Sequence, residues 1–191
     1  MVMENLDLRI QKTYKSLIEN FEGLLNEKEF EKISVTEICD AAMIRRPTFY
    51  QHFLDKYDFL TFFIKHKMNL VFDYAFQNIN EKEGDFFVLV FEQLLNESDN
   101  VLELIFSIQM NSDIMLEMAS VQEYGQKMLR THVNGGKSKN KLQSFVNEYK
   151  GQIIMGVTIQ SVYWYKKNEE KISIKEMIEL YKETLDKLRS K

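Results

Sequence analysis

The chain has 191 residues, 45% of them hydrophobic and 28% charged, and a formal net charge of −4 at pH 7. This composition is ordinary for a folded soluble protein with one sizeable core or two smaller domains. The single proline and seven glycines leave few obligatory turns, and no stretch alternates with the period of a strand, which argues against a many-stranded sheet. We therefore predict an all-α fold with about nine helices.

The sequence carries no recognisable export or membrane signal. Charges at Glu4, Asp7, Arg9 and Lys12 fall where a signal peptide would be apolar, and no apolar run approaches the length of a membrane span. The one cysteine, Cys39, cannot form an internal disulfide. It is either a small buried residue or, if exposed with a low pKa, a redox sensor. We expect a cytoplasmic protein.

The first predicted helix covers residues 6–27, and residues 28–33 are predicted to form a loop. Apolar residues recur along this helix at the spacing that places them on one face. They are Ile10, Tyr14, Leu17, Ile18, Phe21, Leu24 and Leu25. The opposite face carries Arg9, Lys12 and Lys15, which form either a solvated surface or a surface beside a phosphate.

Two short helices are predicted to follow. Ser34 and Glu37 form a capping box, so a helix should begin at Val35. Pro47 is tolerated only in the first turn of a helix, so a second helix should cover about residues 47–53. Between them the chain must turn, and Met43 lies where left-handed backbone angles are favoured, at a cost of about 1 kcal/mol for a residue with a side chain.

The second of these helices has two different sides. Phe49 and Phe53 have the i, i+4 spacing that anchors one side to a core. The other side carries groups that hydrogen-bond to phosphates and to base edges. These groups belong to Arg45, Arg46, Thr48, Tyr50, Gln51 and His52. A pair of short helices with this second member predicts a helix-turn-helix that reads DNA.

The same residues carry a family resemblance. Its elements are Val35-Thr36-Glu37-Ile38, Ala41-Ala42, Thr48-Phe49-Tyr50-Gln51-His52-Phe53, Lys56 and Asp58-Phe59-Leu60. Together they resemble the DNA-binding domain of the tetracycline-repressor (TetR) family over about residues 8–62. This chain departs from the family at Met43, where glycine is usual, and at Arg45, where serine is usual.

The resemblance implies two domains and a mode of action. Residues 1–55 would bind DNA, and residues 56–191 would form a helical domain for effector binding and dimerisation. An effector would shift the linking helix and so change the spacing of two DNA-reading heads. The C-terminal part resembles, more weakly, the regulators found near dihydroxyacetone kinase operons, some of which are activators that work through a protein partner.

Each polar side chain of the helix-turn-helix is given an expected contact. Arg45 and Arg46 would meet phosphates or guanine edges, and Thr48 and Gln51 base edges or the sugar-phosphate backbone. Tyr50, His52 and Lys56 would meet the sugar-phosphate backbone of the DNA. The full predicted DNA-binding set is Thr36, Arg45, Arg46, Thr48, Tyr50, Gln51, His52 and Lys56.

The charge of this region is unusual for a DNA-binding domain. Residues 1–55 carry 7 Lys and Arg against 10 Asp and Glu, a net charge of −3, and the rest of the chain carries −1. DNA binding then depends on a local cluster of basic residues, which predicts few phosphate contacts per subunit and modest non-specific affinity. The low basicity also motivates an alternative, an adaptor whose DNA-binding head is weak.

The rest of the chain is predicted to be helical. Asp55 can cap a long helix from Lys56 to about residue 80, which is apolar on both sides and links the two domains. Further helices are predicted over residues 85–97, 101–110, 112–133, 141–167 and 173–189, with a polar loop at 134–140.

Aromatic residues and methionines are concentrated in residues 57–165. Methionine is adaptable, so this concentration suits either a deformable apolar effector pocket or an ordinary core. The residues predicted for such a pocket are Phe63, Phe87, Phe91, Phe106, Met110, Met118, Tyr124 and Met155.

The last two helices carry apolar stripes that predict a four-helix interface between two copies of the chain. Packing within one chain is the alternative for the last helix. A glycine inside a helix costs about 1 kcal/mol and is tolerated where helices approach closely. The predicted dimer residues are Ile153, Gly156, Val157, Gln160, Trp164, Met177, Ile178, Tyr181 and Leu185.

Other chemistry has little support. His52, His66 and His132 have no partner at metal-ligand spacing, and no phosphate loop, nucleophile motif or dinucleotide motif is found. We predict no enzyme, no metal site and no cofactor. The predicted function is a homodimeric, sequence-specific transcriptional repressor that binds double-stranded operator DNA and a small apolar effector. The alternative is an activator or adaptor controlled by a protein partner.

Overall fold

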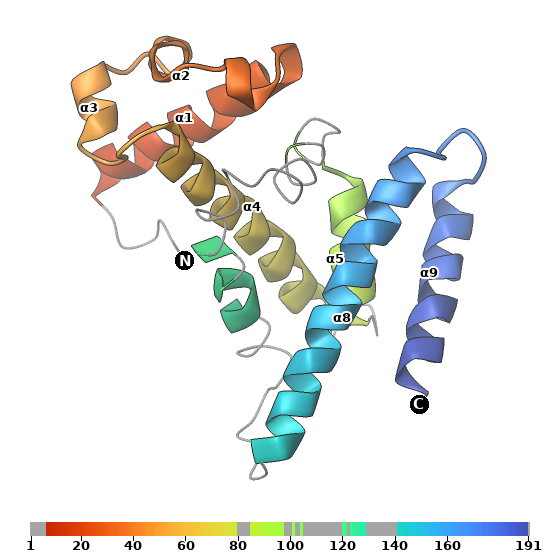
Figure 1. Cartoon of the computed structure of the whole chain (residues 1–191). Helices are drawn as coiled ribbons and strands as arrows, with labels where there is room; N and C mark the ends of the chain where they lie inside the picture. The colour runs from red at the N-terminus through yellow and green to blue at the C-terminus, as the bar shows by residue number, and fades with distance from the viewer. Residues whose placement is uncertain are drawn as a thin grey trace. The chain divides into compact units, whose positions relative to one another are not determined.

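The computed structural model describes residues 7–79, 85–97, 101, 104, 120–121, 123–128 and 141–190. Every regular element among these residues is a helix, so the predicted all-α fold is confirmed (Figure 1). Most of the helices predicted over residues 101–110 and 112–133, and all of the loop predicted over residues 134–140, lie outside the described residues.

The chain forms two compact units. The first comprises residues 1–69 and 98–121, and the second comprises residues 70–97 and 122–191. The units therefore meet inside helix α4 (Lys56–Asn78), whereas the predicted domain boundary coincides with the start of that helix.

Helices α1 (Leu8–Glu27), α2 (Val35–Ala41) and α3 (Arg46–Tyr50) build the first unit together with the first part of α4. The predicted capping box is present, since the Ser34 side chain accepts from the Glu37 N–H and the Glu37 carboxylate accepts from the Ser34 N–H. The segment predicted as a loop contains a short 3-10 helix, Phe30–Lys32.

Aromatic rings form the centre of the first unit. Phe21 of α1 lies edge-on to Phe59 and Phe63 of α4, with ring centroids 5.1 and 5.0 Å apart. Phe49 of α3 is fully buried against Phe53 and Phe59. Edge-to-face pairs of this kind stabilise a core beyond the area they bury. The short α3 is therefore held by its Phe49 side.

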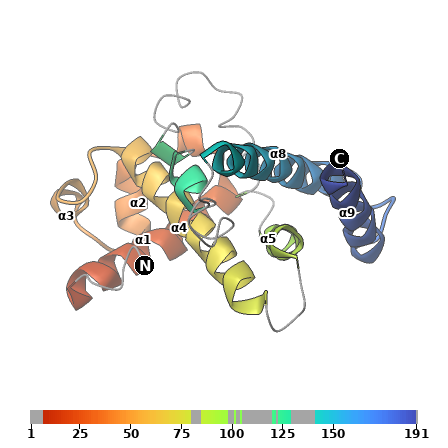
Figure 2. The ribbon, with the colours of Figure 1, turned by 90° about the horizontal axis from the view of Figure 1, so that it is seen from below.

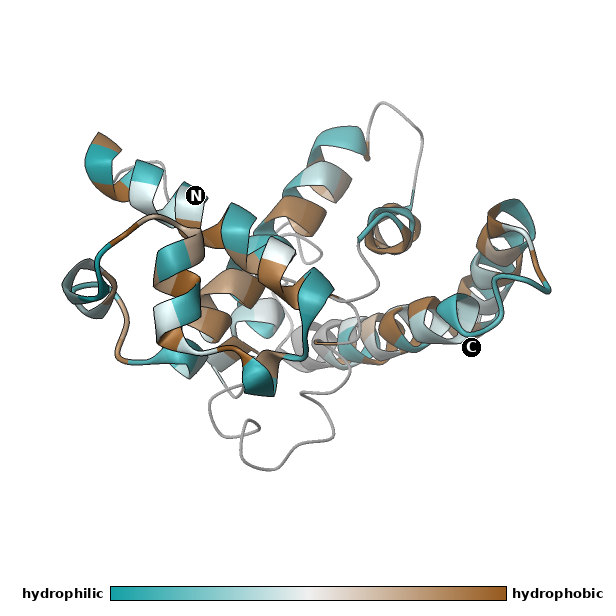
Figure 3. Cartoon of the chain, turned by 90° about the horizontal axis from the view of Figure 1, so that it is seen from above, coloured by the Kyte–Doolittle hydropathy of each residue, from teal (hydrophilic) through white to brown (hydrophobic). Residues whose placement is uncertain are grey.

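Helices α5 (Phe86–Leu95), α8 (Lys141–Lys166) and α9 (Ile174–Arg189) build the second unit with the end of α4. Helix α5 packs against both α8 and α9, and seven of its ten residues are buried. Helices α8 and α9 run antiparallel and are joined by a short turn (Figures 1 and 2). Figure 3 shows hydrophobic and hydrophilic residues mixed along these helices, as expected for elements with a buried and an exposed side.

Three interactions attach α9 to its unit. The Tyr181 ring, in the middle of α9, stacks on Phe91 with centroids 4.2 Å apart, and its hydroxyl is hydrogen-bonded to Thr158 of α8. At the C-terminal end of α9, Arg189 pairs with Asp85, which also caps α5. None of the described helices has the length and apolar character needed to cross a membrane.

Candidate functional sites

In the turn between α2 and α3, Met43 adopts the left-handed backbone conformation. Helix α2 ends at Ala41, and Met43 has φ of 54°, the only positive φ of a non-glycine residue in the described part of the chain. The turn is closed by the Ile44 N–H, which donates to the Cys39 carbonyl at 3.0 Å. A methionine in place of the usual glycine therefore destabilises this turn by about 1 kcal/mol, as the sequence predicted.

Helix α3 begins one residue earlier than predicted and ends three residues earlier. Arg45 has extended backbone angles and occupies the N-cap, Arg46 is the first helical residue, and Pro47 follows in the first turn. The two arginines therefore lie at the N-terminal end of α3, where the N–H groups of the first turn also point outward. Both arginine side chains are exposed.

Five of the eight predicted DNA-binding residues are exposed in the first unit. They are Thr36, Arg45, Arg46, Tyr50 and Gln51, while Thr48 and His52 are partly buried. Figures 1 and 2 show α3 at the periphery of this unit. Arg46 and Tyr50 lie in α3, Arg45 and Gln51 are its caps, and Thr36 lies in α2. Helix α3 and its caps thus bring hydroxyl, amide and guanidinium groups together.

His52 is turned partly toward its own unit. Its ring lies edge-on to Tyr14 of α1 with centroids 5.2 Å apart, and its Nδ1 is 3.5 Å from the Tyr14 hydroxyl. Burial raises the pKa of Tyr14. His52 therefore attaches the end of the helix-turn-helix to α1 as well as lying near the expected DNA surface.

Lys56 does not fit its predicted role as a contact to the DNA backbone. Its Nζ lies 2.9, 3.1 and 3.4 Å from the carbonyl oxygens of Glu31, Ile33 and Phe30, and 4.8 Å from the centre of the Phe30 ring. The ammonium group thus stabilises the carbonyl end of the 3-10 helix. Sequence spacing could not show this, because the carbonyl groups come from residues about 25 positions earlier.

Ion pairs occupy other basic residues beside α2. Lys28 pairs with Glu37, and Lys32 pairs with Glu29 at 2.9 Å. Hydrogen bonds from Lys28 and then from Ser34 lower the pKa of Glu37 to about 2. Glu37 therefore remains charged at neutral pH and connects the start of α2 to the end of α1.

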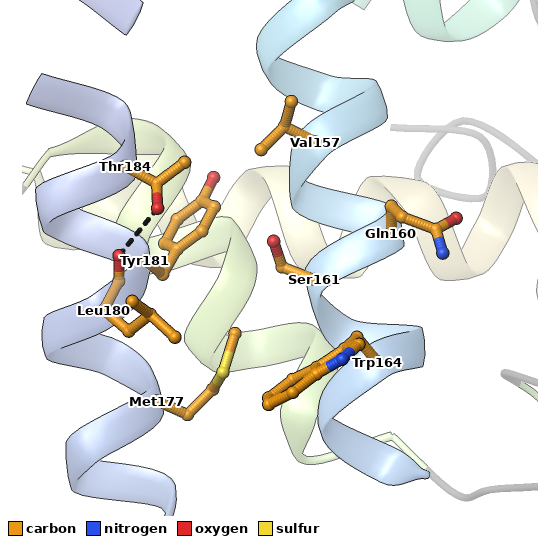
Figure 4. A pocket seen from close by; sticks show the side chains of 8 residues that line it. All are labelled: Val157, Gln160, Ser161, Trp164, Met177, Leu180, Tyr181 and Thr184. Atoms are coloured by element: carbon orange, nitrogen blue, oxygen red, sulfur yellow. Dashed lines mark hydrogen bonds between the residues drawn. The ribbon is translucent and has the colours of Figure 1, made fainter. Parts of the chain in front are cut away.

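A second candidate site is an open groove between α8 and α9, with a volume of about 320 Å³. Trp164 of α8 and Met177 of α9 point toward each other across it, and Gln160 points away from α9 (Figure 4). The lining residues are Val157, Gln160, Ser161, Trp164, Met177, Leu180, Tyr181 and Thr184.

The outer face of α8 continues from this groove and carries large apolar side chains together with the exposed amides of Gln152 and Gln160. Tyr149, Ile153 and Trp164 are exposed on it, with 67% of Tyr149 accessible to solvent. Gly156 lies on the same face, and a Cβ atom added there would meet nothing within 4 Å. Among the described residues, no close helix contact therefore requires this glycine.

The predicted dimer residues differ in their exposure to solvent. Ile153, Gly156, Gln160 and Trp164 are exposed on α8, and Val157 and Ile178 are partly buried. Met177, Tyr181 and Leu185 do not fit the prediction, because they are at most 3% exposed and lie in the core of their own unit. These three residues of α9 pack within their own chain, which was the alternative given for the last helix.

The predicted effector residues are not gathered by any one described cavity. Phe63 is buried in the core of the first unit, whereas Phe87 and Phe91 are buried in the second. Tyr124 and Met155 are partly buried, and Phe106, Met110 and Met118 lie outside the described residues. Among the described residues, no three His, Cys, Asp or Glu side chains are placed to hold a metal ion.

The fold is similar to that of solved transcriptional regulators. The fatty acid degradation regulator FadR from Bacillus halodurans matches with a TM-score of 0.63 and 17% identity, over 97% of this chain and 96% of that chain. FadR from Bacillus subtilis, solved with stearoyl-CoA, matches with a TM-score of 0.59 and 20% identity, over 94% and 97%. The dihydroxyacetone kinase operon activator DhaS matches with a TM-score of 0.57 and 20% identity, over 93% and 94%.

No family model and no curated protein matches this sequence. At 17–20% identity, the similarity to the solved regulators establishes the fold of the whole chain.

Proposed function

We propose that the protein is a sequence-specific DNA-binding transcriptional regulator of the TetR type that acts as a homodimer. The observation that carries this proposal is the construction of α3. One side of this short helix is fully buried through Phe49, while Arg45, Arg46, Tyr50 and Gln51 are exposed around it. A rigidly held helix that exposes such groups is what reading a major groove requires. The fold shared with solved regulators supports the same function.

The exposed groups suggest a division of roles on DNA. Arg45 and Arg46 meet phosphates or guanine edges, and Gln51 reads a base edge. Tyr50 meets the sugar-phosphate backbone, which positions the helix without selecting a sequence. Tyr50→Ala should then weaken binding to all duplexes, whereas Gln51→Ala should change the preferred sequence.

Competition binding on a randomised duplex library tests this division, with circular dichroism to verify that both variants fold. Equal losses on every sequence for both variants would refute the assigned roles.

A salt titration of DNA binding separates the regulator from the adaptor. Two arginines per protomer predict a slope of log K against log salt of about −4 for a dimer. An absence of salt-dependent binding at low ionic strength would favour the adaptor.

The homodimer is supported by the apolar outer face of α8. A recognition helix of this length reads only a few base pairs, so two copies about one DNA turn apart are needed for useful specificity. The α8 face offers apolar side chains around an unhindered glycine, Gly156, where two helices can approach closely. A two-fold interface buries the same residues on both copies.

A matched pair of substitutions tests the interface. Ile153 on α8 and Ile174 at the start of α9 are 45% and 46% exposed, so each can be replaced by arginine at similar cost to its own unit. Ile153→Arg should shift the protein to monomers in analytical ultracentrifugation, and Ile174→Arg should leave the dimer intact. A dimer that survives Ile153→Arg would contradict the proposed face.

We also propose that the protein represses transcription and that an effector bound in the helical C-terminal unit controls its affinity for DNA. FadR from Bacillus subtilis was solved with stearoyl-CoA, so this compound is a suitable first probe. An effector that binds the folded state raises the melting temperature and should change operator affinity. If acyl-CoA compounds alter neither property, an activator or adaptor controlled by a protein partner becomes the better description.

A further inference from the structure

Large apolar side chains are concentrated around the recognition helix. In the described part of the first unit, four large hydrophobic residues are exposed, namely Leu8, Met43, Tyr50 and Leu54. Three of these four lie within residues 43–54. Met43 and Leu54 are 93% and 85% exposed, more than Leu8 at 72%. Single exposed hydrophobic residues are common on protein surfaces, but this grouping coincides with the element proposed to enter a DNA groove.

Met43 also has an unfavourable backbone. Its φ of 54° suits glycine, and its side chain is almost fully exposed, so it makes few packing contacts that could stabilise the fold. Strained residues that give the isolated fold no benefit are often found where a ligand is contacted. The exposed side chain of Met43 is therefore available for a contact with another molecule.

Few of the cations in the segment around the recognition helix, residues 28–56, are available for phosphates. Between residues 28 and 56, Lys28 and Lys32 pair with glutamates, and the Lys56 ammonium hydrogen-bonds to carbonyl oxygens. Arg45 and Arg46 are the other basic residues of this segment, and both are exposed. A surface with so few available cations must obtain more of its affinity from contacts other than ion pairs.

We propose that Met43 and Leu54 contact thymine 5-methyl groups and so help to select the operator. This inference rests on the proposed function, because it requires α3 to lie in the major groove. The thymine methyl is the apolar group that base pairs present in that groove. Because α3 spans only Arg46–Tyr50, the two residues flank it, each within a few positions of a predicted base-reading side chain.

The test begins with duplexes of about 20 base pairs, or roughly two DNA turns, selected by the wild-type protein from a random library. Each thymine is then replaced in turn by deoxyuridine, which lacks the 5-methyl group but keeps the same hydrogen-bonding groups. At one or more positions in each half-site, the loss of the methyl should weaken binding about fourfold, the effect of burying one methyl group.

Protein variants assign those positions to side chains. Leu54→Ala and Met43→Gln should each bind the thymine and uracil duplexes equally at the position that the replaced side chain contacts. Met43→Gln keeps a side chain of similar length on the same left-handed backbone. Leu8→Ala, which removes an exposed leucine outside the recognition element, is the matched control and should retain the wild-type preference.

Two results would overturn the inference while leaving sequence-specific DNA binding intact. One is a wild-type protein that tolerates uracil at every position, and the other is a thymine preference that both variants retain. An absence of binding to any duplex at low salt would overturn the proposed function, and this inference with it.

Discussion

Helices α3 and α8 each bury one side and expose the other, but their exposed sides differ in chemistry. Helix α3 and its two caps expose Arg45, Arg46 and Gln51, whereas α8 exposes Tyr149, Ile153 and Trp164. Charged and amide groups suit a hydrated polyanion, and aromatic and aliphatic groups suit a protein surface that excludes water. The comparison shows how two exposed faces of one chain can indicate two different classes of partner.

The two helices are also held in place differently. Helix α3 has 5 residues, too few to be stable alone, and it depends on Phe49 and on the turns at its ends. Helix α8 has 26 residues and packs against α5 and α9. Changes at caps and turns should therefore affect the first unit most, and changes in packing the second.

The largest expected effect is at Tyr181 in the second unit. Tyr181→Ala removes a buried ring stacked on Phe91 and should destabilise the protein by about 3–5 kcal/mol in urea unfolding. Thr158 donates to the Ile154 carbonyl, so the Tyr181 hydroxyl donates to Thr158, and Tyr181→Phe should cost only about 1 kcal/mol. Tyr149→Ala, on the exposed face, should change monomer stability by less than about 0.5 kcal/mol. Similar losses at Tyr149 and Tyr181 would erase the distinction between the two sides of the second unit.

Capping boxes allow a matched test of the two units, because Ser34 caps α2 and Ser173 caps α9 with the same hydrogen bonds. Ser34→Ala and Ser173→Ala should each cost about 1 kcal/mol in thermal or urea unfolding. Only Ser34→Ala should also weaken DNA binding in a duplex titration, since α2 supports the recognition helix. Equal effects of both variants on DNA binding would argue against this separation.

Replacing Met43, which has a left-handed backbone conformation, should stabilise the first unit. Met43→Gly relieves the positive φ and removes a side chain that packs little, so stability should rise by about 1 kcal/mol. Differential scanning calorimetry measures the change. Met43→Ala keeps a Cβ atom in the same conformation and should give no such gain; if it does, relief of backbone strain is not the cause.

Glycine replacement in α8 should separate stability from assembly. A Cβ atom at Gly151 or Gly156 meets no atom of the described residues within 4 Å, so Gly151→Ala and Gly156→Ala should each stabilise the helix by about 0.5–1 kcal/mol. Gly156 is exposed on the proposed dimer face and Gly151 is buried. Sedimentation should therefore show weaker dimers for Gly156→Ala alone, and unchanged dimers for both variants would place the closest helix approach elsewhere.

The smallest effect is expected at Glu37, which is accessible to solvent and whose interactions are screened. Its pKa in the folded state is about 2, below the ordinary value of 4.5, because Lys28 and Ser34 hydrogen-bond to the carboxylate. The stability it contributes is present above about pH 4.5 and is lost as the pH falls toward 2. Glu37→Gln should be less stable than wild type at pH 7 and equal to it near pH 2, measured by unfolding across this range. A constant difference at all pH values would mean that the charge is not responsible.

Local signals made much of the fold, and of the helices that carry the candidate DNA-binding site, predictable. The capping residue Ser34 determined where α2 begins, and Pro47 and Phe49 indicated a short helix with one buried side. Helical periodicity located α1, α4, α5, α8 and α9 to within a few residues. Such signals act between residues one to four positions apart, so they can be read from the sequence without knowledge of the fold.

Only the tertiary structure decided which partner each amphipathic side chain has. It placed Lys56 over carbonyl oxygens of the 3-10 helix and His52 against Tyr14. It also placed Tyr181 in the core beside Phe91, although Lys182 and Glu183 follow it in sequence, and it left Trp164 exposed, although that residue lies between two tyrosines. The sequence by itself determined the helices and the group of side chains proposed to bind DNA, because those depend on local chemistry. Which apolar side chains remain exposed depended on contacts between helices far apart in the chain.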